Sequence, residues 1–168
     1  MPSLQLNIST LAKETVSECI EKKVTFGTAE SCTGGLISAY VTDVPGASAV
    51  FFGGIVSYDN SIKAGVLGVQ NETLSAHGAV SEETAGEMSV GARRLLGVDF
   101  AVSVTGIAGP GGGTDVKPVG LVYISVASPN GCIVTKNLFS GNREEVRLQT
   151  VSKALLLLTE EIRKSRGK

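Results

Sequence analysis

Hydrophobic and polar positions alternate along this chain between a helical period of about 3.6 residues and short apolar runs typical of buried strands. The first helix is expected near the N-terminus, where one face carries Ile8, Leu11, Thr15, Cys19 and Ile20. Helical spacing returns over residues 36–41, 81–96 and 143–164. The chain is therefore expected to place helices at its start, in its middle and at its end.

Polar residues and glycines mark the ends of the middle helices. Ser81, followed by two glutamates, is a suitable N-cap, and Gly97 is a suitable stop for the helix between them. Asn60 or Ser61 could cap a shorter helix that runs to Leu67. Both helices are expected to begin directly after polar segments of the chain.

Apolar runs between these helices predict strands. The runs cover residues 24–29, 49–58, 100–105, 119–128 and 132–140. The second run is weakened at Gly53 and Gly54, and the turn residues at 129–131 join the last two runs as a hairpin. Alternating strands and helices predict a layered α/β domain over residues 1–168, and the hairpin makes the sheet mixed.

Composition and charge narrow the function classes. The chain has 168 residues, of which 42% are hydrophobic and 18% charged, so one packed domain is expected and general disorder is excluded. A formal charge of −1 lacks the basic surplus that nonspecific nucleic-acid binding needs. With 5% aromatics and no tryptophan, a base-stacking platform is not expected either.

The cysteines and the single histidine argue against a metal or disulfide framework. Cys19, Cys32 and Cys132 are widely separated, and His77 has no second histidine with which to share a metal. No apolar run approaches the about 20 residues that span a bilayer, and no secretory signal is seen. We expect a reduced, cytoplasmic protein without metal or cofactor.

Polar, glycine-rich sequence follows three of the predicted strands. The segments cover residues 28–35, 57–63 and 105–113. Ligands in open α/β sheets bind beyond the carboxyl ends of the strands, so we expect the three segments to converge on one site.

Ser31 is a candidate nucleophile because it lies between a strand and a helix. Unpaired backbone N–H groups at a helix start can bind a developing oxyanion, and a hydroxyl there could attack a carbonyl held by them. The alternative is that Ser31 or Thr33 only caps the helix. Cys32 is a rival nucleophile, since a thiol at a helix start has a lowered pKa, but it could equally be a packing residue.

A serine nucleophile needs a base, and His77 lies in a turn-like stretch that favours a structural role. Lys63 is the alternative, with Tyr58 five residues earlier to relay a proton or hold the amine. Its pKa must fall by about three units, or about 4 kcal/mol, to serve as a base at neutral pH. Burial would have to supply most of that shift. Otherwise Lys63 is a solvated surface residue.

The third polar segment resembles a phosphate loop only in part. Gly106 and Gly111 have Walker A spacing, but Gly112 occupies the lysine position, which disfavours a nucleoside triphosphatase. Arg143 and Arg147 lie four residues apart, so they share a helix face and could clamp a phosphate. Alternatively, they are solvated charges that pair with neighbouring glutamates.

Taken together, the motifs resemble those of the CinA C-terminal domain family over about residues 4–162. The segments that carry the resemblance are Thr28–Gly35, Tyr58–Lys63, His77–Ser81, Thr105–Pro110 and Phe139–Arg143. The resemblance implies a three-layer α/β/α sandwich with a mixed, mostly parallel sheet of about five strands. It also implies the activity of the family's stand-alone bacterial members, which hydrolyse the carboxamide of nicotinamide mononucleotide (NMN) to nicotinate mononucleotide and ammonia. A homodimer is a further expectation at the level of the family.

Site residues follow from the resemblance by position. Ser31 would be the nucleophile, Lys63 the general base and Tyr58 its helper, without metal or cofactor. By position, Thr105, Gly106 and Arg143 would line the substrate site. The expected substrate-binding set also includes Glu30, Cys32, Thr33, Gly34, Gly35 and Arg147, which follow from the interpretation of the residues themselves. Within it, backbone N–H groups near Cys32–Gly35 or Gly106 would stabilise the oxyanion.

Further assignments and two alternatives accompany this interpretation. The phosphate would contact Arg143 or Arg147, and Glu30 or Asp59 would face the cationic pyridinium ring. One alternative is a catalytically silent nucleotide-binding or interaction domain that uses the same loops. The other is a cysteine hydrolase that acts through Cys32.

Overall fold

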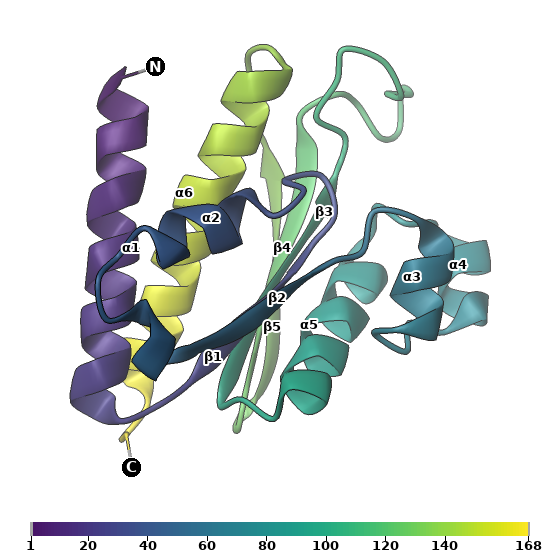
Figure 1. Ribbon diagram of the computed structural model, residues 1–168. Coiled ribbons are helices and arrows are strands. Elements are labelled where there is room, and N and C mark those ends of the chain that lie inside the picture. The colour runs from purple at the N-terminus through teal and green to yellow at the C-terminus, as the bar shows by residue number, and fades with distance from the viewer. Residues whose placement is uncertain (1, 168) are drawn as a thin grey trace.

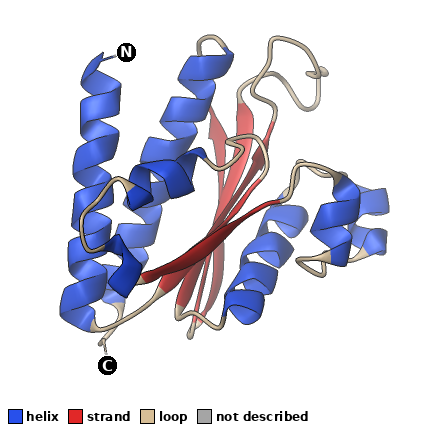
Figure 2. Cartoon of the chain, viewed as in Figure 1, coloured by secondary structure: helices blue, strands red, loops and turns tan. Residues whose placement is uncertain are grey.

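A five-stranded mixed sheet with helices on both faces organises the chain in the computed structural model, which describes residues 2–167 (Figures 1 and 2). The strands are β1 (Phe26–Glu30), β2 (Phe51–Val56), β3 (Phe100–Gly106), β4 (Leu121–Ser128) and β5 (Gly131–Leu138). The helices are α1 (Pro2–Lys22), α2 (Leu36–Thr42), the 3₁₀ turn η1 (Ala47–Ala49), α3 (Asn60–Gly65), α4 (Asn71–His77), α5 (Glu82–Leu96) and α6 (Arg143–Lys164).

The order of the strands is β2-β1-β3-β4-β5. β1 pairs in parallel with β2 and with β3, whereas β4 is antiparallel to both of its neighbours. The carboxyl ends of β1, β2 and β3 therefore meet at one edge of the sheet, where the three polar segments follow them.

Two helical layers enclose the sheet. α1, α2 and α6 cover one face and bury the larger apolar core, which includes Phe26, Phe100 and Leu155. α5 covers the other face, with α3 and α4 beyond it, over a smaller cluster around Met88 and Leu67 (Figure 1). The expected three-layer α/β/α sandwich with a mixed, mostly parallel sheet is confirmed.

Local chemistry accounts for the helix ends. The Ser81 hydroxyl accepts a hydrogen bond from the Thr84 amide at the start of α5, and Gly97 ends this helix in the left-handed region, as expected. Asn142 and Glu145 form a reciprocal capping box at the start of α6. The cap of α3 is Asp59, rather than Asn60 or Ser61, because its carboxylate accepts from the Ser61 amide.

Other expectations differ from the structure in detail. α4 was not expected, because none of its residues is buried and it has no apolar periodicity. Ile20 was placed on the inward face of α1 but is 49% exposed. In β2 the register shifts between Phe51 and Gly53, next to the weak point expected at Gly53 and Gly54. Within residues 2–167, no helix is both long and apolar enough to cross a membrane.

Candidate active site

Ser31 lies at the start of a tight turn between β1 and α2. Its amide donates to the Val104 carbonyl on β3, and its own carbonyl accepts from the Gly34 amide. Gly34 and Gly35 have positive φ angles of 62° and 95°, which glycine adopts without strain. The side chain of Ser31 is only 8% exposed, so its hydroxyl is held at the edge of the sheet with little contact with solvent.

Glu30 holds this turn from inside the protein. Its side chain is fully buried, and one carboxylate oxygen accepts from the Thr33 hydroxyl and from the Gly35 and Ile37 amides. The other oxygen accepts from both the amide and the hydroxyl of Ser38. The expectation that Glu30 contacts substrate is therefore wrong, because its carboxylate occupies the start of α2 that a ligand anion would otherwise use.

Lys63 is the buried amine of the site. It is 1% exposed, and its Nζ atom lies 3.2 Å from Ser31 Oγ. The same nitrogen donates to the carbonyl oxygens of Ser57, at 2.8 Å, and Tyr58, at 3.1 Å. The segment that joins β2 to α3 thus wraps around the amine and directs it toward Ser31.

This environment makes Lys63 easier to deprotonate than a solvated lysine. Burial lowers the pKa of the Lys63 amine below its usual 10.5, against the opposing charge of Asp59. A neutral amine has two N–H groups and one lone pair. In the structure Nζ donates to the carbonyls of Ser57 and Tyr58 and to Ser31 Oγ, and once the amine has lost a proton its two N–H groups can stay on the carbonyls while its lone pair faces the Ser31 hydroxyl.

Tyr58 contributes through its backbone as well as its side chain. Its carbonyl oxygen accepts a hydrogen bond from the Lys63 amine. Holding this amine is one of the two roles expected for Tyr58. Its side chain is 64% exposed, and its hydroxyl accepts from Arg143 at 3.4 Å. The proton-relay role has no corresponding contact between the Tyr58 hydroxyl and Lys63 among the described residues.

The three strand-end segments do converge. They line a cavity of about 190 Å³ formed by Ser31, Cys32, Tyr58, Lys63, Ala79, Val80, Thr105, Gly106, Ala108 and Arg143. Thr105 is buried, and its hydroxyl donates to the Ala79 carbonyl, which ties β3 to the segment before α5. A Cβ atom on Gly106 would come within 3.0 Å of Val122 and of the Leu121 carbonyl, so only glycine fits there without a shift of β4.

The two arginines of α6 act at different places. Arg143 lines the cavity and donates to the Gly109 carbonyl at 2.9 Å. Arg147 lies outside the lining and donates to the carbonyls of Cys32, at 3.2 Å, and Thr33, at 2.7 Å. Only Arg143 therefore lines the cavity, whereas Nε and Nη2 of Arg147 are bound to the turn, and the shared phosphate clamp stays a prediction.

Some of the backbone amides expected to stabilise an oxyanion already donate hydrogen bonds within the protein. The amides of Gly34 and Gly35 donate to the Ser31 carbonyl and to Glu30, and the Thr33 side chain is buried against Glu30. The amides of Cys32 and Thr33 donate to no backbone oxygen among residues 2–167, but Thr33 is fully buried and does not line the cavity. Cys32 and Gly106 do line it, so their amides stay the candidate oxyanion donors.

The rival catalytic groups lie in unsuitable surroundings. Burial raises the pKa of the Cys32 thiol to about 12, which keeps it protonated at neutral pH. His77 ends α4 at the surface, where its Nδ1 lies 3.3 Å from a carboxylate oxygen of Glu83. Sequence reasoning missed Ala79, Val80 and Ala108 as lining residues, because small apolar side chains carry no chemical signal.

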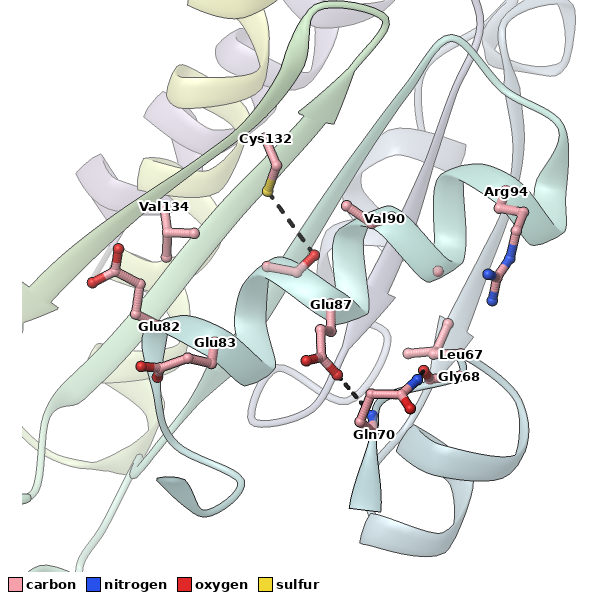
Figure 3. A pocket seen from close by; sticks show the side chains of 12 residues that line it. Leu67, Gly68, Gln70, Glu82, Glu83, Glu87, Val90, Arg94, Cys132 and Val134 are labelled. Atoms are coloured by element: carbon pink, nitrogen blue, oxygen red, sulfur yellow. Dashed lines mark hydrogen bonds between the residues drawn. The ribbon is translucent and has the colours of Figure 1, made fainter. Parts of the chain in front are cut away.

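A larger cavity of about 620 Å³ lies over α5, on the face of the sheet that this helix covers (Figure 3). Its lining includes Val90 of α5, Cys132 on β5 and Gln70 before α4. Among the residues that the structure describes, no three His, Cys, Asp or Glu side chains gather as a metal site.

Comparison with known proteins places these features in a family. Residues 8–162 match the model of the CinA C-terminal domain. The chain is 65% identical over 111 residues to a CinA-like protein of Leptospira borgpetersenii, which covers 66% of this chain and 27% of that protein. It is 51% identical over 148 residues to a putative competence-damage inducible protein of Acetivibrio thermocellus, which covers 88% of this chain and 36% of that protein. The chain thus spans about a third or less of the curated relatives' length.

Solved structures resemble the chain over nearly its whole length. The competence/damage-inducible protein CihA of Agrobacterium tumefaciens has a TM-score of 0.91 and 42% identity, covering 94% of this chain and 96% of that one. A CinA superfamily protein of Klebsiella pneumoniae has a TM-score of 0.90 and 34% identity, covering 94% and 99%.

Proposed function

The chain belongs to the CinA C-terminal domain family, and from this premise we propose that it hydrolyses the carboxamide of NMN to nicotinate mononucleotide and ammonia. One observation carries the proposal. A buried amine with a lowered pKa lies 3.2 Å from a serine hydroxyl, in a cavity at the carboxyl ends of parallel strands. This pair has the composition of an activated nucleophile and its base.

In the first half of the reaction, the Lys63 amine takes the proton of the Ser31 hydroxyl while Ser31 Oγ bonds to the carboxamide carbon. The carbonyl oxygen becomes an oxyanion, for which the amides of Cys32 and Gly106, two residues that line the cavity, are the candidate donors. The Lys63 ammonium then gives its proton to the amide nitrogen, the C–N bond breaks, and ammonia leaves. Ser31 is left as an ester of the nicotinate carbonyl group.

In the second half, a water molecule replaces ammonia. Lys63 takes a proton from this water while its oxygen bonds to the ester carbon. The bond to Ser31 Oγ then breaks, and the serine oxygen regains a proton from Lys63. The new carboxylic acid releases the second proton of the water to solvent, nicotinate mononucleotide leaves as a carboxylate, and both side chains return to their initial states.

Two adjoining cavities support a substrate with two distinct ends. The cavity at Ser31, of about 190 Å³, is of the size of a pyridine ring with its carboxamide. A second cavity of about 550 Å³ shares Ala108 and Arg143 with it and also includes Asn142 and Glu144. Arg143 thus stands between them, where a guanidinium suits the phosphate of a nucleotide. The free thiols support a reducing compartment, and we propose a cytoplasmic location.

Ammonia release from NMN tests the proposal. The wild type should release one ammonia for each nicotinate mononucleotide formed, measured by a coupled ammonia assay and by chromatography. Ser31→Ala should release none while it binds NMN almost as tightly by calorimetry, because the hydroxyl contributes little to binding. Retained turnover by Ser31→Ala would remove Ser31 as the nucleophile. Binding without turnover by the wild type would instead support a silent nucleotide-binding domain.

A further inference from the structure

The turn that carries Ser31 is held from two opposite sides by buried or half-buried charges. Glu30 accepts hydrogen bonds from the Thr33 hydroxyl and the Gly35 amide on one side. Arg147 donates from α6 to the carbonyls of Cys32 and Thr33 on the other. Each charge binds only one kind of group, so together they fix which way the peptides of the turn face.

Peptide geometry transmits the hold of Arg147 to the nucleophile. In a trans peptide the C=O and N–H groups point in opposite directions, and the peptides of this turn are trans. The Thr33 carbonyl faces Arg147, so the Gly34 N–H of the same peptide points the other way, where it donates to the Ser31 carbonyl at 3.1 Å. In the preceding peptide, the Cys32 carbonyl faces Arg147, and the Thr33 N–H is therefore turned away from the guanidinium.

Arginine suits this task better than lysine does. Its planar fork reaches both carbonyls at once, through Nε to Cys32 and through Nη2 to Thr33. A lysine ammonium is a point donor on a flexible stem, and it would hold one carbonyl less firmly.

On the basis of the proposed function, we infer that Arg147 is a positioning residue for catalysis. It fixes the two peptide planes that set the backbone of Ser31 and the direction of the Thr33 amide, and it does not bind the substrate phosphate. Arg143, one helical turn away, contacts the cavity itself, so two arginines of one helix face have separate tasks.

The experiment measures the reactivity of Ser31 in two ways on Arg147→Met, Arg147→Lys and a control, Arg94→Met. Arg94 is an exposed arginine on α5, away from the catalytic cavity. The first measurement is the rate at which a fluorophosphonate probe labels Ser31, a reaction in which Ser31 Oγ bonds to phosphorus and fluoride leaves. The second is kcat and KM for NMN. Thermal unfolding identifies variants that do not fold.

A misplaced reacting group costs about 10²-fold in rate, so Arg147→Met should lower both the labelling rate and kcat by about that factor with KM near the wild-type value. Arg147→Lys, which keeps the charge, should recover part of the loss, and Arg94→Met should match the wild type. If Arg147→Met does not fold, the labelling rate of folded Arg147→Lys must lie below that of the wild type.

The inference is overturned if Arg147→Met raises KM at unchanged kcat, since Arg147 would then bind substrate. It is also overturned if folded Arg147 variants are labelled at the wild-type rate, or if wild-type Ser31 is not labelled at all. Labelling requires no NMN. A wild type that is labelled at Ser31 but releases no ammonia would contradict the proposed function, while the comparison of labelling rates would still test Arg147.

Discussion

Two cavities of this molecule differ in a way that size does not predict. The cavity at the strand ends holds about 190 Å³ and contains the buried pair Ser31 and Lys63. The cavity over α5 holds about 620 Å³, and its lining includes the exposed side chains of Val90 and Arg94 (Figure 3). The smaller cavity is the better candidate for chemistry, because only there does burial lower the pKa of a lysine beside a hydroxyl.

The polar groups of the larger cavity have structural tasks or contact solvent. The Glu87 carboxylate accepts from the Gln70 amide and the Thr73 hydroxyl, which joins α5 to the start of α4. Glu83 is exposed and lies beside His77. A buried titratable side chain with a shifted pKa is therefore a better sign of a catalytic site than the volume of a cavity.

Removal of the Lys63 amine should have the largest effect, and it tests whether the cavity at Ser31 carries the activity. Lys63→Met should lower the rate of ammonia release at least about 100-fold, because Met cannot accept the proton of Ser31. Arg94→Met in the larger cavity should leave the rate unchanged. Steady-state kinetics on both variants, with circular dichroism to verify folding, check the prediction. An unchanged rate in Lys63→Met would redirect the search for the base to His77.

The same variant gives a pH dependence of stability whose sign is fixed by the lowered pKa. Between the folded pKa of Lys63 and its unfolded value near 10.5, the unfolded chain binds more protons than the folded one. Wild-type stability relative to Lys63→Met should therefore rise with pH across this window. Melting temperatures of both proteins measured at several pH values below 10.5 test this, and a constant or falling difference would contradict the buried neutral amine.

A smaller effect is expected for Arg143, which lines the cavity at Ser31. Arg143→Ala should raise Kd for NMN about tenfold or more and leave the binding of nicotinamide riboside nearly unchanged, because a guanidinium–phosphate contact contributes about 1.5–3 kcal/mol. Calorimetry with both ligands, on inactive Ser31→Ala as background, measures the difference. Equal weakening of both ligands would argue against a phosphate contact.

The thiol next to the nucleophile should matter less. Cys32→Ser should keep most of the activity, because the Cys32 thiol, with its pKa raised to about 12 by burial, is protonated at neutral pH. Iodoacetamide should modify exposed Cys132 first, without loss of ammonia release. Inactivation of the wild type that Cys32→Ser abolishes would restore the cysteine-hydrolase alternative.

Much of the fold could be predicted because its signals are local. Ser81 and Gly97 mark the ends of α5, and the hairpin of β4 and β5 follows from the turn residues between them. The meeting of Ser31 with Lys63 could be expected because parallel strands bring their carboxyl ends to one edge. α4 could not be predicted, because it buries none of its side chains.

The contacts of Glu30 and Arg147 could not be predicted from the sequence either. The sequence does not show whether a glutamate at the end of a strand faces a ligand or the backbone of its own chain. Only the fold brings five hydrogen-bond donors, from Thr33, Gly35, Ile37 and Ser38, to the Glu30 carboxylate. Arg147 and Arg143 have the spacing of a clamp, but the turn at Ser31 lies against only one of them.

The smallest expected effect concerns charge near Lys63. Hydrogen bonds from Ser61 lower the pKa of the Asp59 carboxyl, so Asp59 is ionised at neutral pH, and its charge opposes the fall of the Lys63 pKa. Asp59→Asn keeps a good N-cap for α3 and removes the charge, so the pKa of Lys63 should fall further. Because activity requires the neutral amine, the rising limb of the pH–rate profile should move to lower pH, by less than about one unit. The shift should shrink at high salt, since Asp59 is exposed. The matched change Glu83→Gln beside the larger cavity should leave the profile in place, whereas a shift of Asp59→Asn to higher pH would contradict Lys63 as the base.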